Sequence, residues 1–532
     1  MTQPNEEVIG GEKDAPPPPP PTETPQLAFP PAGLIDLNNL EPTVKALLEN
    51  LQGNILKGHG RDHVKLVFVK FTGAVQDIKK AIAEFANKPY LQSTLAQLEY
   101  VKRFNQYGIP GPLFANILLS ASGYQAIGIT DLGSFQEAVE DSQGLEVTVK
   151  FSDGAKSAKV LSELNDPPVQ VWEQPYQEQL DGLVILADDD KDNLINVLNE
   201  TIQHFKQVAT IVTVESGDAL RNAQKDSIEH FGYVDGRSQP LFFTSDLEKE
   251  IRELDGDDPT LNEEKPVTKF DPRAELDLVL VRDPFAPSKE HFGSYFVFRK
   301  LEQNVQGFKQ QEQQLADALG LVNEQRELAG AYTVGRFEDG TPVVMRSSDG
   351  LNSPVPNNFN YADDPDGSKC PFSSHLRKMN PRGDIANIFG NPNVPDTDPL
   401  SIPKLNRDER NRRIARRGIT YGERTIGPEG PLNDLPTKDV GLLFMCFQSS
   451  ISKQFGFLQK RWANADRFVK PGTGIDPVIG QHPLAERPIA QKCPLEWGQP
   501  GSIRFGFDGF VTLKGSEFFF APSLPFLQGL GS

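Results

Sequence analysis

A short run in the middle of the chain places one carboxylate between two glycines. The run is FGYVDGRSQP, residues 231–240, in which Gly232 and Gly236 stand on either side of Asp235. Glycines allow the backbone to bend tightly and to approach another group closely, so the carboxylate can be held in one fixed direction. The same pattern is also typical of an ordinary turn. On its own, the run leaves both interpretations open.

A second run places a histidine among permanent cations. His375 lies in KCPFSSHLRKMNPR, residues 369–382, close to Arg377, Lys378 and Arg382. Nearby cations disfavour a further positive charge on the imidazole, and a neutral imidazole is the form that ligates iron or zinc. The same cations suit anionic groups such as carboxylates or phosphates. A lone histidine is more often structural than a ligand, so on its own the run leaves both a structural histidine and a metal ligand open.

The third run, NRRIARRGITYGE at residues 411–423, is rich in arginine. It stands in a chain whose formal net charge is −19. One interpretation is an exposed basic face that pairs with Asp408, Glu409 and Glu423 nearby. The other is that one arginine points into a site that handles an anion.

Motifs for other common chemistries are absent from the sequence. Its seven histidines and three cysteines form no HExxH, CxxC or CxxCH, which excludes standard zinc and c-type haem signatures. It also lacks GxSxG and GxxxxGK[ST], the signatures of serine hydrolases and P-loop nucleotide sites.

Composition narrows the class of protein further. The acidic balance of the 532 residues argues against nucleic acid as a partner, three cysteines make no disulfide framework, and no apolar run approaches the roughly 18 residues of a transmembrane helix. Residues 1–40 contain six consecutive prolines and lack a classical signal peptide. We expect a disordered tail there, with the protein cytoplasmic or exported by a non-classical route.

Hydrophobic periodicity predicts a strand–helix–strand–strand–helix–strand order in the first half of the chain, as in a ferredoxin-like α+β unit. A helix precedes it at residues 41–56, ending near Gly53. The expected strands are 64–71, 115–120, 183–188 and 207–215, and the expected helices are 74–84 and 191–204. This order predicts an N-terminal domain over residues 41–215.

The second half repeats the mixture of strands and helices and predicts a larger domain over residues 216–532. Strands are expected at 275–281, 293–301, 441–448 and 509–513, and helices at 304–319 and 323–330. Polar stretches at 245–274, 351–370 and 385–410 are expected to be long loops, which either line a functional site or lie on the surface.

Together, the three runs resemble the dye-decolourising peroxidases in their long form with extended loops. The resemblance covers nearly the whole chain after residue 40. It also rests on LQGNILKGHGR, GSYFVFRKLEQ, VGRFEDGTP, GLLFMCFQ, FLQKRWANADRF, GIDPVIGQ and GSEFFFAPSLPFL, which occur in the expected order. The resemblance implies an α+β fold of two ferredoxin-like domains with antiparallel sheets, of the dimeric α+β barrel type, with haem in the second domain.

The family's functional residues carry over to matching positions of this chain. His375 corresponds to the iron ligand, Asp235 to the distal acid and Arg416 to the distal arginine, with Arg417 as the alternative if the register differs by one. Asp476, in GIDP, is expected to accept a hydrogen bond from the ligand imidazole. The remaining cofactor-binding positions are Leu442 and Phe444, expected to wall the distal face.

The resemblance implies a peroxidase with one non-covalent haem b that reduces hydrogen peroxide and oxidises dyes, phenolics or similar aromatic reductants. Asp235 would act as acid and base, and Arg416 would hold its pKa low, so we expect an acidic optimum. For bulky reductants we expect electron transfer through Tyr421 or, second, Trp462. The alternatives are a haem-binding or haem iron-removing protein without significant turnover, and an interaction protein that works through its proline-rich tail.

Overall fold

The computed structural model describes residues 33–135, 137, 147–254, 269–351, 354–425, 434–482 and 490–531. Of the residues 1–40 expected to form a disordered tail, residues 1–32 lie outside this part of the chain. Residues 33–40 are described, and Ile35 is buried and pairs with Phe243, so the expected tail extends too far. None of the helices in the described part has the length and apolar character needed to cross a bilayer.

The first half of the chain forms the expected ferredoxin-like unit. Its strands are β1 (His63–Phe71), β2 (Phe114–Ser120), β3 (Gly182–Asp188) and β4 (Ala209–Asp218), and the helices α2 (Val75–Ala86) and α7 (Lys191–Phe205) connect them. The spatial order is β4-β1-β3-β2, and all pairs are antiparallel. Every residue of β2 and β3 is buried, because both faces of the sheet are covered.

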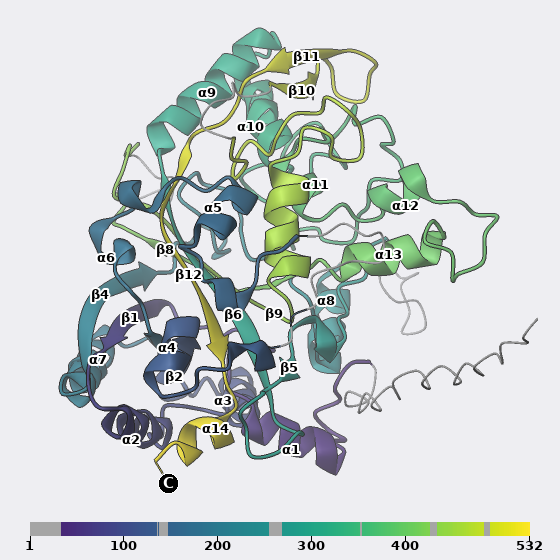
Figure 1. The fold of residues 1–532 in the computed structure, drawn as a ribbon. Coiled ribbons are helices and arrows are strands. Elements are labelled where there is room, and N and C mark those ends of the chain that lie inside the picture. The colour runs from purple at the N-terminus through teal and green to yellow at the C-terminus, as the bar shows by residue number, and fades with distance from the viewer. Residues whose placement is uncertain are drawn as a thin grey trace, which may run out of the picture.

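The second half builds the same strand order from more distant segments. β12 (Val511–Ala521), β6 (Phe292–Gln303) and β9 (Gly441–Gln448) lie side by side, and the edge next to β9 is made by β7 (Ala415–Arg416) and β8 (Ile419–Tyr421). The order β12-β6-β9-β7 therefore places the last strand beside the first, as in the N-terminal unit (Figure 1). This repeat of order confirms the expected α+β fold with antiparallel ferredoxin-like sheets.

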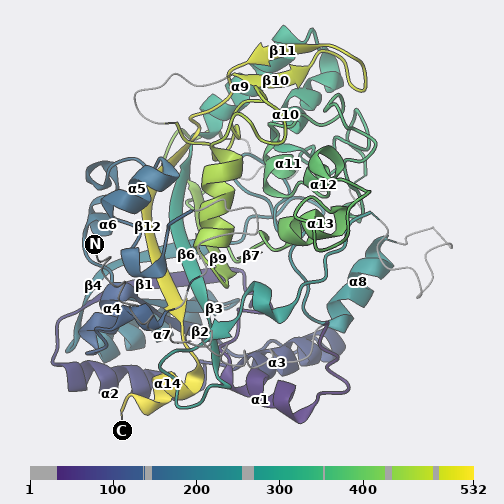
Figure 2. The ribbon, with the colours of Figure 1, turned by 45° about the vertical axis from the view of Figure 1, so that its right-hand side comes forward.

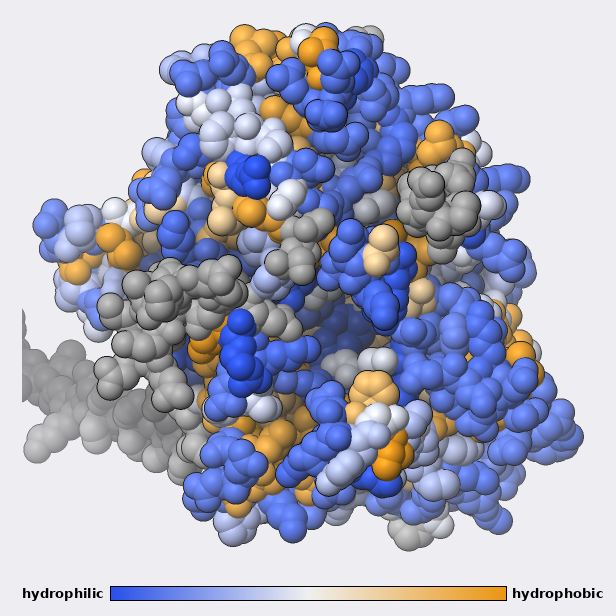
Figure 3. Space-filling model, turned by 180° about the vertical axis from the view of Figure 1, so that it is seen from behind, coloured by the Kyte–Doolittle hydropathy of each residue, from blue (hydrophilic) through white to orange (hydrophobic). Residues whose placement is uncertain are grey.

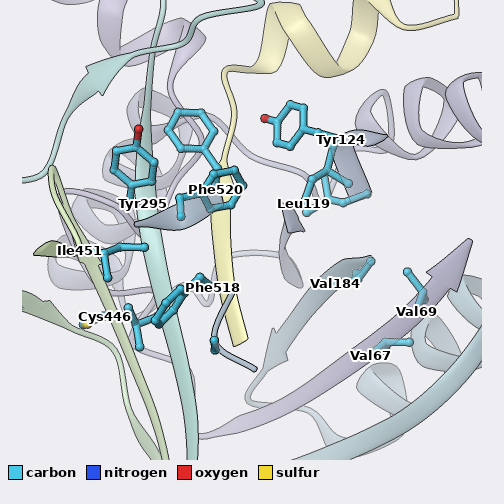
Figure 4. Close-up of a cluster of buried hydrophobic side chains, with 14 of the residues drawn as sticks. Val67, Val69, Leu119, Tyr124, Val184, Tyr295, Cys446, Ile451, Phe518 and Phe520 are labelled. Atoms are coloured by element: carbon cyan, nitrogen blue, oxygen red, sulfur yellow. The ribbon is translucent and has the colours of Figure 1, made fainter. Parts of the chain in front are cut away.

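The two units share one continuous sheet. Phe519 and Phe520 of β12 pair with Ser120 and Leu119 of β2, which joins the two four-strand orders edge to edge. Along β6, Tyr295 and Val297 belong to one buried cluster and Phe296 and Phe298 to another, because successive side chains point to opposite faces. Figure 4 shows part of the first cluster, where Tyr295, Phe518, Phe520 and Tyr124 gather around β6 and β12.

Helices cover the sheet and extend one end of the molecule. Around the C-terminal strands, α11, α12 and α13 gather on one side (Figure 2). The other α-helices are α1 (Pro42–Asn50), α3 (Thr94–Tyr107), α4 (Ala121–Ala126), α5 (Ala158–Leu164), α6 (Gln174–Gln177), α8 (Thr244–Leu254), α9 (Val305–Ala318), α10 (Glu327–Val334), α11 (His375–Met379), α12 (Asp384–Phe389), α13 (Ile402–Arg410) and α14 (Leu524–Gly529). The remaining strands are β5 (Val281–Arg282), β10 (Gln491–Pro494) and β11 (Ser502–Phe505).

Several expected elements are wrong or have different bounds. Residues 275–280 do not form a strand, and β5 begins only at Val281. Leu276–Leu278 is a 3₁₀ turn, and the apolar spacing arises because Leu276, Leu278 and Leu280 are all buried here. The helix expected to end near Gly53 ends at Asn50, where Leu51 becomes extended. The stretches expected to be loops at 245–274 and 385–410 contain α8, α12 and α13, although residues 255–268 lie outside the described part.

Candidate active site

A glycine-bounded hairpin presents Asp235. Gly232 and Gly236 have φ angles of +102° and +84°, in the left-handed region that glycine adopts without strain. The buried carboxylate of Glu229 accepts hydrogen bonds from the backbone N–H groups of Phe231 and Tyr233, at 2.8 and 3.0 Å. These contacts fix the hairpin from inside, so its carboxylate has a defined direction.

Arg416 meets Asp235 because the edge strand beside β9 is interrupted. β7 ends at Arg416, and the strand resumes as β8 after Arg417 and Gly418. The Nη1 group of Arg416 donates to Oδ1 of Asp235 at 2.7 Å, and its Nη2 group donates to the carbonyl of Arg237 at 2.7 Å. The second bond orients the guanidinium plane, so the ion pair is held at both ends.

The surroundings of Asp235 favour its charged form. Burial alone would raise the pKa of this carboxyl, but the Arg416 guanidinium and the N–H of Gly236 lower it further than burial raises it. The pKa of Asp235 therefore lies below its usual 3.8. A carboxylate of this kind remains a base at acid pH.

The neighbouring Arg417 does not share this contact. Its guanidinium donates to the backbone carbonyls of Asn54, Ile55 and Arg416. Of the two arginines that the sequence left open, Arg416 is the one that pairs with Asp235.

His375 begins the short helix α11 and is held by a carboxylate from a distant loop. Its Nδ1 lies 2.9 Å from Oδ2 of Asp476. Asp476 is fully buried, and its Oδ1 also accepts the N–H groups of Val478 and Ile479 at 2.8 and 3.0 Å. The carboxylate is thus an acceptor on both oxygens, which places the imidazole proton on Nδ1 and leaves Nε2 with a free lone pair.

The two partners shift each other's pKa in opposite directions. Burial would lower the pKa of His375, but the charge of Asp476 and its hydrogen bond raise it above 6.5 overall. Burial would raise the pKa of Asp476, but His375 and the two backbone N–H groups lower it overall. The pair therefore favours an electron-rich imidazole when Nε2 binds a cation.

These groups line one cavity with a volume of about 320 Å³. Asp235, Arg416 and His375 are among its polar lining residues, and the expected wall residues Leu442 and Phe444 also line it. Other apolar side chains also line it, among them Leu301, Leu376, Met379, Ile414, Phe455, Leu458, Val478, Ile479, Val511 and Leu513. Seen from behind, the mostly hydrophilic surface is hollowed near its centre (Figure 3).

The expected electron-transfer residues lie elsewhere. Tyr421 and Trp462 are buried, and neither lines the cavity. The hydroxyl of Tyr421 has no hydrogen-bond partner, and the ammonium of Lys300 lies 4.9 Å from its ring centre. Trp462 packs edge-on against Phe457 and Phe468.

The cations next to His375 bind groups of the protein itself rather than an external anion. Arg377 is fully buried between the rings of Tyr361 and Phe372 and pairs with Asp364 and Asp384. Lys378 donates to the carbonyls of Trp462 and Ala465, and Arg382 donates to those of Asn357 and Phe359. These contacts anchor α11, which carries His375.

Two buried arginines in the cavity wall were not identified from the sequence. Arg336 has no partner for Nη2, and Arg299 has none for Nε or Nη1, although its Nη2 group bonds Asp166. The sequence signal for Arg336 was its place in VGRFEDGTP, a motif that gave no role to the arginine. Guanidinium groups that keep unpartnered N–H groups beside an apolar cavity suit the carboxylates of an otherwise apolar ligand.

The residues present thus fit a haem. One histidine offers Nε2, apolar side chains surround it, and cationic donors with free N–H groups lie in the wall. Among the described residues, no group of three or more His, Cys, Asp or Glu side chains could hold a bare metal ion.

Comparisons with known proteins identify the family. The family described as "Dyp-type peroxidase, C-terminal" matches residues 257–474. "Multifunctional dye peroxidase DyP2" from Amycolatopsis sp. is 41% identical over 497 residues, which cover 91% of this chain and 96% of that protein. The chain belongs to the dye-decolourising peroxidase family.

Other members support the assignment. "Dye-decolorizing peroxidase msp1" from Mycetinis scorodonius is 30% identical and aligns over 90% of this chain and 86% of its own. The crystal structure of a DyP-type peroxidase from Anabaena sp. has a TM-score of 0.81 at 39% identity, with 93% of this chain and 97% of that chain covered. This dye-decolourising peroxidase is accordingly a haem-dependent enzyme, as the resemblance implied.

Proposed function

We propose that this enzyme binds one non-covalent haem b through Nε2 of His375, reduces hydrogen peroxide, and oxidises dyes, phenolics or similar aromatic reductants. The observation that carries the proposal is the presence of two charge-coupled pairs in one site: Asp235 with Arg416, and His375 with Asp476. The haem would supply the redox chemistry. None of the three cysteines lines the cavity, which supports non-covalent binding.

Asp235 would move the proton during cleavage of the O–O bond. Peroxide must lose a proton from one oxygen and gain it on the other, and one carboxylate of suitable direction can perform both transfers. Because its pKa lies below 3.8, Asp235 is available as a base at acid pH, where a histidine is protonated. This supports an acidic optimum.

Arg416 would stabilise the negative charge that develops on the departing oxygen. Its fixed position costs no reorganisation during the reaction, since the carbonyl of Arg237 and the carboxylate of Asp235 already hold it. On the other pair, Asp476 would keep the proton of His375 on Nδ1 and orient the ring. Arg336 and Arg299 would bind the haem carboxylates through their free N–H groups.

A haem-binding or iron-removing protein without peroxidase turnover is not favoured. Its relatives are named dye peroxidases, and simple haem storage does not require a carboxylate with a low pKa paired to an arginine.

The test is the absorbance spectrum of haem-reconstituted protein before and after peroxide. His375→Ala should lose the normal Soret band, whereas His63→Ala, a surface histidine paired with Asp218, should keep it. Asp235→Asn should keep the band and react with peroxide at least 100-fold more slowly. A normal Soret band in His375→Ala would refute the ligand assignment, and full reactivity of Asp235→Asn would refute the acid–base assignment.

A further inference from the structure

We propose that Ser238 is a positioning residue for the reaction with peroxide: anchored by Arg382, it fixes the loop of residues 236–239 that holds Arg416 against Asp235. The inference rests on the proposed function, in which Arg416 and Asp235 act on peroxide. Ser238 acts through the loop and not on the peroxide itself.

The loop supplies acceptors for Arg416 on both sides of Ser238. Before it, the carbonyl of Arg237 accepts a hydrogen bond from the Nη2 group of Arg416 at 2.7 Å. After it, Oε1 of Gln239 accepts a hydrogen bond from the backbone N–H of Arg416 at 3.1 Å. A displacement of the loop therefore moves the guanidinium group that reaches Asp235.

Side-chain packing does little to hold this loop in place. Residues 236–239 line the active-site cavity and also line a second cavity with a volume of about 390 Å³. A Cβ atom placed on Gly236 would have no atom within 4 Å apart from those of its chain neighbours. A loop that borders two cavities has few packing contacts, so its conformation depends on the hydrogen bonds that hold it.

Ser238 has a backbone conformation that serine rarely adopts. Its φ angle is +64°, in the left-handed region where a side chain is strained and glycine is not. Its hydroxyl donates to Oδ1 of Asn357 at 2.7 Å and accepts a hydrogen bond from Nη2 of Arg382 at 2.7 Å. These two bonds hold the strained conformation, and strain that the surroundings enforce in this way is typical of functional sites.

Arg382 is a rigid anchor for the Ser238 hydroxyl. It is buried, and its guanidinium carbon lies 3.9 and 3.8 Å from the ring centres of Phe270 and Phe359. Its Nη1 group donates to the carbonyls of Asn357 and Phe359, and its Nη2 group also donates to Oδ1 of Asn357. These acceptors are neutral oxygens, and burial lowers the pKa of Arg382 to about 9. Burying a cation against neutral acceptors is costly, which indicates that the site requires the planar fork of an arginine.

The segment that Arg382 binds also holds Arg237. The Nη2 group of Arg237 donates to the carbonyl of Val355 at 3.0 Å and lies 3.5 Å from Oε1 of Glu250. The same Oε1 accepts a hydrogen bond from Nδ2 of Asn357 at 2.6 Å. Two successive residues of the loop are thus fixed to one segment, so the carbonyl of Arg237 is held in one direction.

The experiment measures the second-order rate of reaction of the haem-reconstituted enzyme with peroxide by stopped-flow absorbance. Ser238→Gly removes the hydroxyl but fits the left-handed backbone without strain, so the fold and the Soret band should be retained. Its rate should fall about tenfold, because Arg416 is present but no longer held in position. The matched control is Lys225→Gly, since Lys225 also has a positive φ of +69° but is exposed and lines neither cavity. This control should react at the wild-type rate.

A double-mutant cycle tests whether Ser238 acts through Arg416. In the Arg416→Leu background, Ser238→Gly should change the rate by less than about twofold, because the group that Ser238 positions is gone. Arg382→Lys keeps the positive charge and loses the planar fork, so it should slow the wild-type enzyme and have little effect without Arg416.

The pH–rate profile gives a second measurement. The charges that act on Asp235 are those of Arg416 and His375, and Ser238→Gly removes neither. Its acid limb should still move to higher pH, toward that of Arg416→Leu, because the guanidinium is held less firmly against the carboxylate.

Three results would overturn the inference: a wild-type rate in Ser238→Gly, an acid limb of that variant at the wild-type pH, or an equal effect of Ser238→Gly with and without Arg416. A wild-type enzyme that shows the Soret band but does not react with peroxide would instead overturn the proposed function. The wild-type rate thus distinguishes the two failures.

Discussion

Removal of Arg416 should move the acid limb of the pH–rate profile to higher pH. The proposed base is the carboxylate of Asp235, so the reaction with peroxide slows as pH falls through its pKa. That pKa is lowered because the Arg416 guanidinium, 2.7 Å away, outweighs burial. In Arg416→Leu, Asp235 remains buried but loses the positive charge of the guanidinium, so the pKa of Asp235 rises.

The size of the expected pKa shift follows from how far Asp235 and Arg416 are exposed to solvent. An opposite charge this close lowers a carboxyl pKa by about 1 to 3 units. The side chains of Asp235 and Arg416 are 35% and 33% exposed, so solvent screens part of the attraction and the lower end, about one unit, applies. We expect a shift of about one pH unit, equivalent to about 1.4 kcal/mol. The plateau rate should also fall by about 100-fold, because charge on the departing oxygen loses its donor.

The assay is the second-order rate of reaction with peroxide, measured by stopped-flow absorbance between pH 2.5 and 7. Arg416→Lys retains the charge and should keep the acid limb within a few tenths of a unit of wild type. Arg417→Leu removes the adjacent arginine, whose donors go to backbone carbonyls, and should leave the limb in place. An unshifted limb in Arg416→Leu, or an equal shift in Arg417→Leu, would show that Asp235 is not the group that titrates.

Three further variants test the supports of the site. Asp476→Asn should raise the reduction potential of the haem iron, measured by spectroelectrochemistry, because His375 loses a charged acceptor and binds as a weaker donor. Glu229→Gln tests the pH dependence of stability. Burial raises the pKa of Glu229 to about 7, so the folded wild type binds this proton more tightly than the unfolded chain and loses about 1.4 kcal/mol of stability per pH unit between pH 4.5 and 7. The variant lacks this carboxyl, so it should not show that loss. Urea unfolding at pH 5 and pH 8 measures this difference, which should be absent if the carboxyl is ionised throughout. Arg377→Met should cost about 3–5 kcal/mol in unfolding free energy, since it leaves two buried aspartates without a counter-charge, whereas Arg467→Met at an exposed position should cost less than about 0.5 kcal/mol.

The sequence predicted the elements whose side chains alternate or repeat regularly. β1, β2, β3, β6 and β9 were found within a few residues, because each has a long run of apolar, β-rich residues whose burial matches one pattern. The helices α2, α7 and α9 were found for the same reason. These elements set the sheet order, so the fold class was predictable from local pattern together with the resemblance.

Short elements and turns were not predictable in this way. β7 and β8 have two and three residues and lie in a run dominated by arginine, so their periodicity carries no signal. Their pairing with β9 depends on register set far away in the chain. Residues 275–280 mislead for the opposite reason: their alternation is regular, but tertiary packing buries them in a turn.

The cations beside His375 illustrate why composition identifies a region better than a role. The run 375–382 suggested anion binding. Its cationic side chains instead pair with buried aspartates or donate hydrogen bonds to backbone carbonyls, and these contacts hold α11 in place. The arginines with unpartnered N–H groups in the cavity come from β6 and from the residue two after α10, where no basic cluster marks them. A buried cation is identified as structural or functional only by its partners, and partners are tertiary information.

The same reasoning explains why the site is assembled from pairs. Asp235 and Arg416 are 181 residues apart, and His375 and Asp476 are 101 residues apart. In each pair, one partner changes the proton affinity of the other, so neither residue has its functional pKa until the sheet brings both together. A local motif such as GYVDG therefore identifies the reactive carboxylate and its turn. The shifted pKa that makes the carboxylate reactive depends on its contact with a partner far away in the sequence. Loss of either partner should for that reason alter the chemistry before it alters the fold, which is the behaviour that separates the Arg416 variant from the structural variant of Arg377.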